Sequence, residues 1–340
     1  MADYSRASRI WRFLCGSAFA LSAILDATCA AAQSAGKARM PIEQLKVSMT
    51  LRLGKTADWV AITETAVWVG STGPNSVHAI DAATNQRVAT VLLPGEPCAG
   101  LAVGFDSLWI PLCGRSGGLA RVDLRTQALI ATYKVGPIAA EGGITTGAGS
   151  VWMVLRSHSL VRIDPSDGTV RHVVQVPAGS FNPYFSAGRI WVTRAKGAEL
   201  TSVDASTGLV VAHLPTGPNP RFLTAGNGAI WTLNQGDGSL SRVEVSGGKP
   251  TQTISLGTPG SGGDITFGAG RIWTTFSQVP LSIVDASVPA LLCQWAGPGG
   301  DSIAFGHDDI WLTNYKAGTI SRIALADIPS DCNVNERPRT

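Results

Sequence analysis

The sequence predicts an all-β protein made of seven copies of one four-stranded unit. A tryptophan marks each copy, and successive tryptophans are 38 to 43 residues apart. In five copies a glycine precedes the tryptophan by five residues, and in six copies an acidic residue follows it by 12 to 14. Units of this length and number are typical of a seven-bladed β-propeller, a ring of four-stranded blades. The marking residues are Trp68, Trp109, Trp152, Trp191, Trp231, Trp273 and Trp311.

The third copy, residues 144–179, shows how one unit is composed. Four short apolar runs are separated by clusters of Gly, Ser, Pro and Asp, which indicates four strands joined by tight turns. Asp164 opens the turn between the third and fourth strands, where its side chain can accept hydrogen bonds from backbone amides. We interpret the repeated tryptophans and acids as parts of the fold, and we expect function where the copies differ.

The two ends of the repeat region predict how the ring closes. Residues 45–54 resemble a fourth strand that has no blade of its own before it, and the seventh copy ends after its third strand. We therefore expect the N-terminal strand to complete the last blade, which removes the open sheet edges. Residues 45–326 then form one propeller domain, followed by a C-terminal tail at 327–340.

The segment before the propeller predicts export. Residues 1–32 combine three arginines, an apolar run at 13–25 and small residues at 30–32, as a signal peptide does. The alternative is a lipoprotein in which Cys29 is acylated. Residues 33–44 are predicted to be a tether. Because no later run reaches 18 apolar residues, we expect no membrane span and a periplasmic or secreted location.

Charge and composition narrow the class of partner. The formal net charge is only +3, and 15% of the residues are charged. A nucleic-acid partner would require a basic stripe, so we expect none. The chain contains 39 glycines, in keeping with many tight turns. We expect a monomer.

Four cysteines remain after the predicted signal peptide, and an even number in an exported protein indicates disulfides. Cys98 enters the second blade and Cys113 ends its second strand, so this pair is preferred. The preferred second pair is Cys293 with Cys332, which would attach the tail to blade six. A zinc site is the alternative, although neither a Cys-x-x-Cys motif nor a paired His accompanies these residues.

The units at 149–176 and 228–257 resemble those of the YVTN-type and virginiamycin B lyase-like seven-bladed β-propellers. The resemblance covers about residues 45–326 and implies the propeller fold. The lyase is a metal-assisted enzyme with a His/Glu set in its last blades. Here His307 is the only histidine near that end, and we expect it on the opposite face. The resemblance therefore does not extend to the lyase reaction, and no catalytic residue is assigned.

Candidate site residues come from the loops that meet around one mouth of a propeller channel. In this region the seven copies differ, and their side chains include acids, bases and aromatics. Such a mixture in a concave site is typical of ligand binding. The predicted rim residues are Asp58, Trp59, Glu141, Asn182, Tyr184, Arg221, Phe222, Asp264 and Asp301, with Arg115, Arg156, Arg194, Asn234, Asn314 and Tyr315 from the loops between second and third strands.

Two functions remain open from the sequence. The first is an exported binding or interaction module that holds a small ligand or a partner protein on one face and needs no cofactor. The second is a metal-dependent hydrolase or lyase, lactonase-like or virginiamycin B lyase-like, with a carboxylate-lined channel. In that alternative the acids would hold Ca²⁺ or Mg²⁺, which bind several oxygen ligands. The arginines would instead favour an acidic ligand or partner surface.

Overall fold

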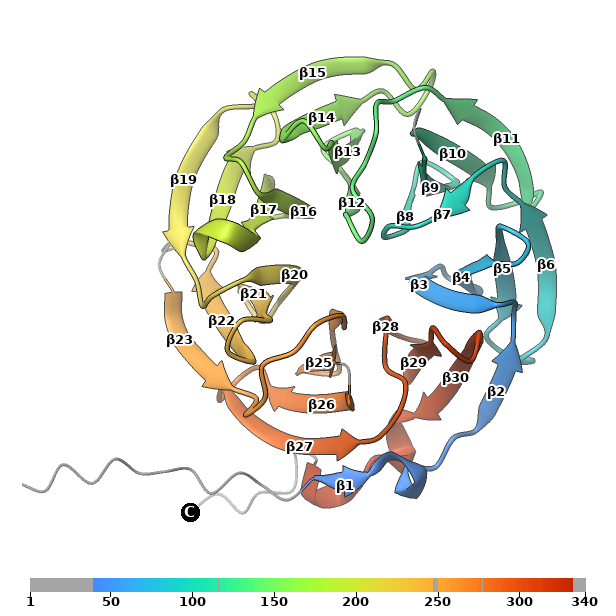
Figure 1. Cartoon of the computed structure of the whole chain (residues 1–340), viewed down its shortest axis with the longest axis vertical. Coiled ribbons are helices and arrows are strands. Elements are labelled where there is room, and N and C mark those ends of the chain that lie inside the picture. Colours follow the sequence, from blue (N-terminus) through green and yellow to red (C-terminus); the bar gives the residue numbers. More distant parts are fainter. Residues whose placement is uncertain (1–38, 115–116, 247–249, 277, 333–340) are drawn as a thin grey trace, which may run out of the picture. The chain divides into compact units, whose positions relative to one another are not determined.

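The computed structural model describes residues 39–114, 117–246, 250–276 and 278–332. The predicted signal peptide, the first part of the predicted tether and Arg115 lie outside these ranges. The Lys37–Thr340 unit contains seven antiparallel sheets arranged in a ring (Figure 1). The prediction of a seven-bladed β-propeller is confirmed.

Blades one to four follow the chain from the inner strand to the outer strand. Blade two is irregular, because its inner strand is split into two short pieces that both pair with β9. Blade one is β3 (Thr56–Ile62), β4 (Ala66–Thr72), β5 (Ser76–Asp81) and β6 (Arg87–Leu92); blade two is β7 (Glu96–Pro97), β8 (Ala102–Gly104), β9 (Ser107–Cys113), β10 (Gly118–Asp123) and β11 (Ala128–Tyr133); blade three is β12 (Ile144–Gly147), β13 (Ser150–Val154), β14 (Ser159–Ile163) and β15 (Val170–Gln175); blade four is β16 (Ser180–Ser186), β17 (Arg189–Arg194), β18 (Glu199–Asp204) and β19 (Val210–Pro215).

Blades five to seven complete the ring. Blade five is β20 (Pro220–Gly226), β21 (Ala229–Asn234), β22 (Ser239–Glu244) and β23 (Pro250–Ser255); blade six is β24 (Ile265–Gly268), β25 (Arg271–Phe276), β26 (Val279–Asp285) and β27 (Ala290–Ala296); blade seven is β28 (Ile303–Gly306), β29 (Asp309–Asn314), β30 (Thr319–Ala324) and the N-terminal β2 (Met49–Arg52). Short 3-10 helices are η1 (Ile42–Gln44), η2 (Ala195–Gly197), η3 (Leu325–Asp327) and η4 (Ser330–Cys332).

The ring closes as predicted, because β2 pairs antiparallel with β30 and so supplies the fourth strand of blade seven. Arg322 of β30 strengthens this closure by donating to the carbonyl oxygen of Ala82 and to Asn85 Oδ1 of blade one, each at 2.7 Å. The first described residues add one further contact, since β1 (Met40–Pro41) pairs parallel with β27. Figure 1 shows β1 outside blade six.

The repeated tryptophans form the packing between blades. All seven are almost completely buried, and six donate from Nε1 to the carbonyl oxygen five residues earlier, as Trp152 does to Gly147 at 3.1 Å. The glycine at this position leaves room for the next blade: a Cβ atom on Gly147 would lie 2.1 Å from the Phe185 ring, and one on Gly226 would lie 2.1 Å from Phe267. The repeated Trp and Gly therefore hold neighbouring sheets together.

The repeated acid builds the outer turn, as the sequence predicts. Asp164 Oδ1 accepts hydrogen bonds from the Ser166 hydroxyl at 2.6 Å and the Ser166 amide at 2.8 Å. These bonds, with the Arg171 guanidinium beside them, lower the pKa of Asp164 to about 2. Asp81, Asp123, Asp204 and Asp285 make the same kind of turn. In blade five Glu244 pairs with Arg242 instead.

Candidate functional site

The innermost strands enter the channel side by side, and the segments where they begin line a cavity of about 300 Å³. We call it the outer cavity. Six predicted residues line it, and they come from blades one, five and seven and from the loop entering blade three. They are Asp58, Trp59, Glu141, Phe222, Asp301 and Tyr315.

Trp59 lies in the channel because its strand is bulged. The pairing of β3 with β4 shifts register between Asp58 and Val60, and Trp59 has a φ of 57°. The Trp59 amide donates to Asp58 Oδ1 at 2.9 Å, so the bulge orients both side chains. A bulge next to a site commonly redirects a side chain in this way.

Trp59 and Phe222 form a partition across the channel. They belong to blades one and five, yet their ring centroids are 6.2 Å apart, and the two residues are only 8% and 5% exposed. Beyond them lies a second cavity of about 210 Å³, the inner cavity. Trp59 and Phe222 are the two residues that line both cavities. The pair therefore forms the floor of the outer cavity and the roof of the inner one.

Three other predicted residues, Asn182, Tyr184 and Asp264, line the inner cavity. Asn182 is 4% exposed, and its Nδ2 donates to the Arg221 carbonyl oxygen at 2.8 Å. Its Oδ1 is buried and has no hydrogen-bond donor among the described residues. Buried acceptors are nearly always paired, so this atom marks a polar position that the fold itself does not satisfy.

Two channel aspartates, Asp58 and Asp264, have raised pKa values. Burial raises the pKa of Asp58 to about 8, against the hydrogen bond from the Trp59 amide and with the help of the charges of Asp301, Asp264 and Glu141. Burial also raises the pKa of Asp264 to about 6, although Asp264 Oδ2 accepts from the Ser302 hydroxyl at 2.7 Å. Several titratable groups with perturbed pKa values in one channel are a common sign of a functional site.

Two further groups at the outer cavity are shifted in the same direction. Burial raises the pKa of Asp301, against a hydrogen bond from the Tyr315 amide to Asp301 Oδ2 at 2.6 Å. Burial, followed by the neighbouring carboxylates, raises the pKa of the Tyr315 hydroxyl. The cavity thus disfavours additional negative charge.

The one predicted base that reaches this region is already paired. Arg221 Nη2 lies 2.8 Å from Glu141 Oε2, and the guanidinium lies 3.8 Å from the centre of the Phe181 ring. Glu141 is therefore partly neutralised at the rim. Asp58 and Asp301 form no ion pair within 4 Å in the described part of the chain, although the charge of Lys316 acts on Asp301.

Four predicted loop residues lie away from both cavities. Arg156 Nε donates to the Ile138 carbonyl oxygen at 3.0 Å, and Arg194 Nε donates to that of Ala178. Asn234 is 0% exposed and bonds Ser239, Ser241 and Thr232, so its amide stabilises its own blade. Asn314 Oδ1 accepts from the Ala317 amide in its turn.

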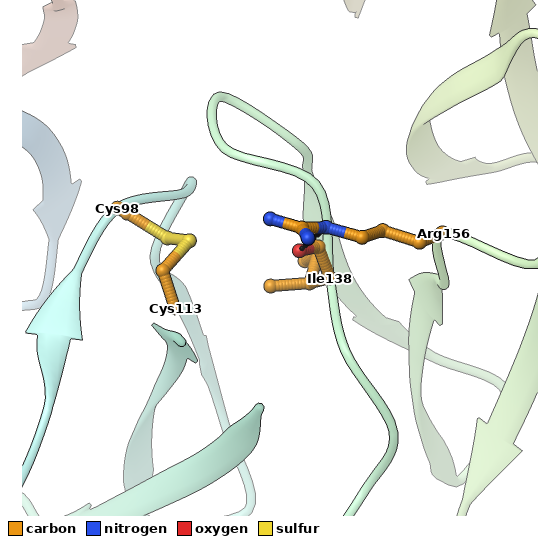
Figure 2. The surroundings of a disulfide bond; sticks show 4 residues. All are labelled: Cys98, Cys113, Ile138 and Arg156. Atoms are coloured by element: carbon orange, nitrogen blue, oxygen red, sulfur yellow. Dashed lines mark hydrogen bonds between the residues drawn. A yellow bond between two sulfur atoms is a disulfide. The ribbon is translucent and has the colours of Figure 1, made fainter. Parts of the chain in front are cut away.

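Both predicted disulfides are present, with Cα–Cα distances of 5.7 Å for Cys98–Cys113 and 5.6 Å for Cys293–Cys332. Figure 2 shows the first beside Ile138 and the Arg156 side chain. Cys98 also lines the outer cavity. The bond therefore joins the wall of the outer cavity to the end of β9.

Sequence reasoning missed part of the lining. Glu96 lies in β7 and lines the outer cavity, as does Gly262 in the segment that enters blade six. Each stands within two residues of a position that the pattern did single out, Cys98 or Asp264. The sequence pattern therefore pointed to the correct loops, but in each of them the predicted cavity residues began one or two positions too far along the chain.

Possible metal ligands were compared over the described ranges. One group of three Asp, Glu, His or Cys side chains has its ligand atoms within 4.8 Å of one another, namely Cys293, Asp331 and Cys332. Its two sulfur atoms are bonded together in a disulfide. The channel acids do not form a group of this kind in the described residues. His307 lies in the turn from β28 to β29, at the other end of the inner strands, and bonds the Thr63 carbonyl oxygen.

No protein-family model and no curated protein matches this chain. Over the described residues, no helix has the length and apolar character needed to cross a membrane.

Proposed function

We propose that this propeller is an exported binding module, of the YVTN-type or virginiamycin B lyase-like kind, that holds a small ligand in the outer cavity. The observation that carries the proposal is the cavity itself. It measures about 300 Å³, which is at the lower end of the range for small-molecule sites, and it combines apolar aromatic groups with a few convergent polar ones.

The position of the cavity also supports a small ligand. Its lining comes from blades one, two, three, five, six and seven, and its side chains are those that differ among the copies. The Cys98–Cys113 disulfide, the second disulfide and the predicted signal peptide favour an oxidising compartment outside the cytoplasm.

A thermal-shift screen of the mature protein against a mixed set of small cationic, neutral and anionic compounds tests this proposal. Ligands that bind the folded state raise the Tm. Hits are then measured on Ala140→Trp, because Ala140 is exposed and lines the outer cavity. Ala83→Trp is the matched control, since Ala83 is exposed in the outer turn of blade one. Hits lost in Ala140→Trp and kept in Ala83→Trp support the proposal; no hits, or hits unaffected by either change, overturn it.

A metal-dependent hydrolase or lyase is the second candidate. Its support is the clustering of raised carboxyl pKa values around Asp58 and Asp264, which is common in catalytic sites. The Tm of the purified protein with Ca²⁺, with Mg²⁺ and with EDTA tests it. Tight stoichiometric metal, whose removal lowers the Tm and which Asp264→Asn abolishes, favours the enzyme; an unchanged Tm counts against it.

A further inference from the structure

The charge on the cavity walls is of one sign. Asp58, Glu96, Glu141 and Asp301 line the outer cavity, and Asp264 lines the inner one. Among the described residues neither lining includes a lysine, an arginine or a histidine. Arg221 reaches only the rim, where it is paired with Glu141.

The same walls carry aromatic side chains. Trp59 and Phe222 form the floor of the outer cavity, and Tyr315 lines its wall. Faces of aromatic rings attract organic cations, and this attraction is stronger when the cation loses water. Carboxyl groups above an aromatic floor are therefore suited to a positively charged group with an apolar body.

Two acceptor atoms of the channel residues have no hydrogen-bond donor in the described part of the chain. Asn182 lines the inner cavity, and its buried Oδ1 has no donor among the described residues. Asp58 uses Oδ1 to accept from the Trp59 amide and forms no hydrogen bond through Oδ2 in the described part of the chain. A ligand in the outer cavity that satisfies Asp58 Oδ2 must donate a hydrogen bond or carry positive charge.

The spacing of the acids favours an organic cation over a metal ion. Ca²⁺ and Mg²⁺ bind oxygens at about 2.0 to 2.6 Å, so their ligand atoms must lie close together. Within the described residues, no three of the channel carboxylates have oxygen atoms within 4.8 Å of one another. They are instead spread around a space of about 300 Å³.

We propose that the channel binds an organic cation with an ammonium group, held between the carboxyl groups of Asp58 and Asp301 over the rings of Trp59 and Phe222. This inference rests on the proposed small-ligand site and names its chemical class. The fold places several carboxyl groups together in a partly buried cavity, and a cation is the ligand that favours their ionised forms.

Isothermal titration calorimetry of the full mature protein with butylamine and choline tests the proposal. Dimethylbutanol, the uncharged carbon analogue of choline, is the first control, and Ca²⁺ and Mg²⁺ are the second. Binding of one amine or ammonium ion per protein, at least about tenfold tighter than the neutral analogue, is expected from a charge-assisted interaction. Equal binding of the neutral analogue, or binding of the metal ions alone, overturns the proposal.

Three variants locate the site, measured at about pH 9, where Asp58 is ionised. There Asp58→Asn and Asp301→Asn each remove one charge from the cavity and should weaken binding by about tenfold. Asp106→Asn removes one charge from an exposed turn, and its left-handed φ of 55° suits asparagine equally well. It should leave binding unchanged. If Asp106→Asn weakens binding as much as Asp58→Asn, the cation is attracted by overall charge rather than by this cavity.

Binding should also depend on pH. Asp301, Asp264, Glu141, Glu96 and Tyr315 surround Asp58, with Lys316 acting on Asp301 and Arg221 paired with Glu141. Because the pKa of Asp58 is about 8, affinity should increase between about pH 6 and about pH 9 and then level off, with proton release on binding. In Asp58→Asn most of this increase should vanish. Affinity that falls over this range contradicts the proposal.

The outcome separates this inference from the function on which it rests. If neutral or anionic compounds bind and Ala140→Trp abolishes their binding, the cavity is a ligand site but its ligand is not a cation. If no compound of any charge binds, both proposals fail.

Discussion

Aspartates in the outer turns and aspartates in the channel have opposite electrostatics in this protein. Asp164 in an outer turn has a pKa of about 2, because the Ser166 hydroxyl and amide bond its carboxylate. Asp58 in the channel has a pKa of about 8, mainly because burial removes water without supplying enough donors. The hydrogen bonds within its turn stabilise the ionised form of Asp164. The fold does not stabilise the ionised form of Asp58 to the same extent, so a ligand can do so.

Tryptophan shows the same division. Trp152 is completely buried between blades and its Nε1 bonds the Gly147 carbonyl oxygen. Trp59 has no counterpart in the repeat and lies between two cavities. Repeated residues therefore stabilise the ring, while residues of the same type at unrepeated positions shape its channel. Substitutions at the two kinds of position should have different effects.

The largest effect is expected from the tryptophans. Trp152→Ala should lower the free energy of unfolding by about 3 to 5 kcal/mol, because it leaves a closed void between blades. Trp59→Ala should cost less, since the space that it leaves joins two existing cavities. Denaturant unfolding of both variants measures the difference. Equal losses would mean that Trp59 is as much a packing residue as Trp152.

Glycines provide the second test. Gly226→Ala should cost about 1 to 3 kcal/mol, because the new Cβ atom would lie 2.1 Å from the Phe267 ring and the two blades must move apart. Gly100→Ala in the channel places its Cβ no closer than 3.7 Å to Gly143, an ordinary contact. Thermal unfolding should show a clear decrease in Tm for the first variant and little change for the second.

Asp58→Asn should change how stability depends on pH. The raised pKa means that the folded state retains a proton that the unfolded state has lost, so this contribution is complete below about pH 4 and is lost as the pH rises to about 8. Relative to the wild type, the variant should gain stability steadily between these pH values, by at most about 1.4 kcal/mol for each pH unit. Denaturant unfolding at several pH values measures it, and a constant difference would contradict the raised pKa.

Asp164→Asn should show a smaller effect of the opposite sign. Its lowered pKa stabilises the folded state above pH 3.8, and this contribution is lost as the pH falls to about 2. The wild type should therefore be slightly more stable than the variant at neutral pH, and the difference should disappear in acid. A difference that grows in acid would show that the turn does not depend on the ionised carboxylate.

The sequence alone was sufficient for the architecture. The tryptophan period predicted seven blades, the unpaired strand around Met49 predicted ring closure, and the cysteine positions predicted both disulfides. These features depend on local turn chemistry and on contacts repeated in every copy, so each copy supplies independent evidence for the same pattern.

Only the tertiary structure decided which loop residues meet. The bulge at Trp59 places its ring against Phe222 of blade five, and this single contact divides the channel into two cavities. The sequence grouped Asn234 with Asp58 as rim residues, but Asn234 bonds within its own blade. Successive side chains of a strand point to opposite faces of the sheet. A bulge or a shift of one position therefore changes which side chain reaches the channel. That choice depends on contacts between distant blades, which no repeat pattern records.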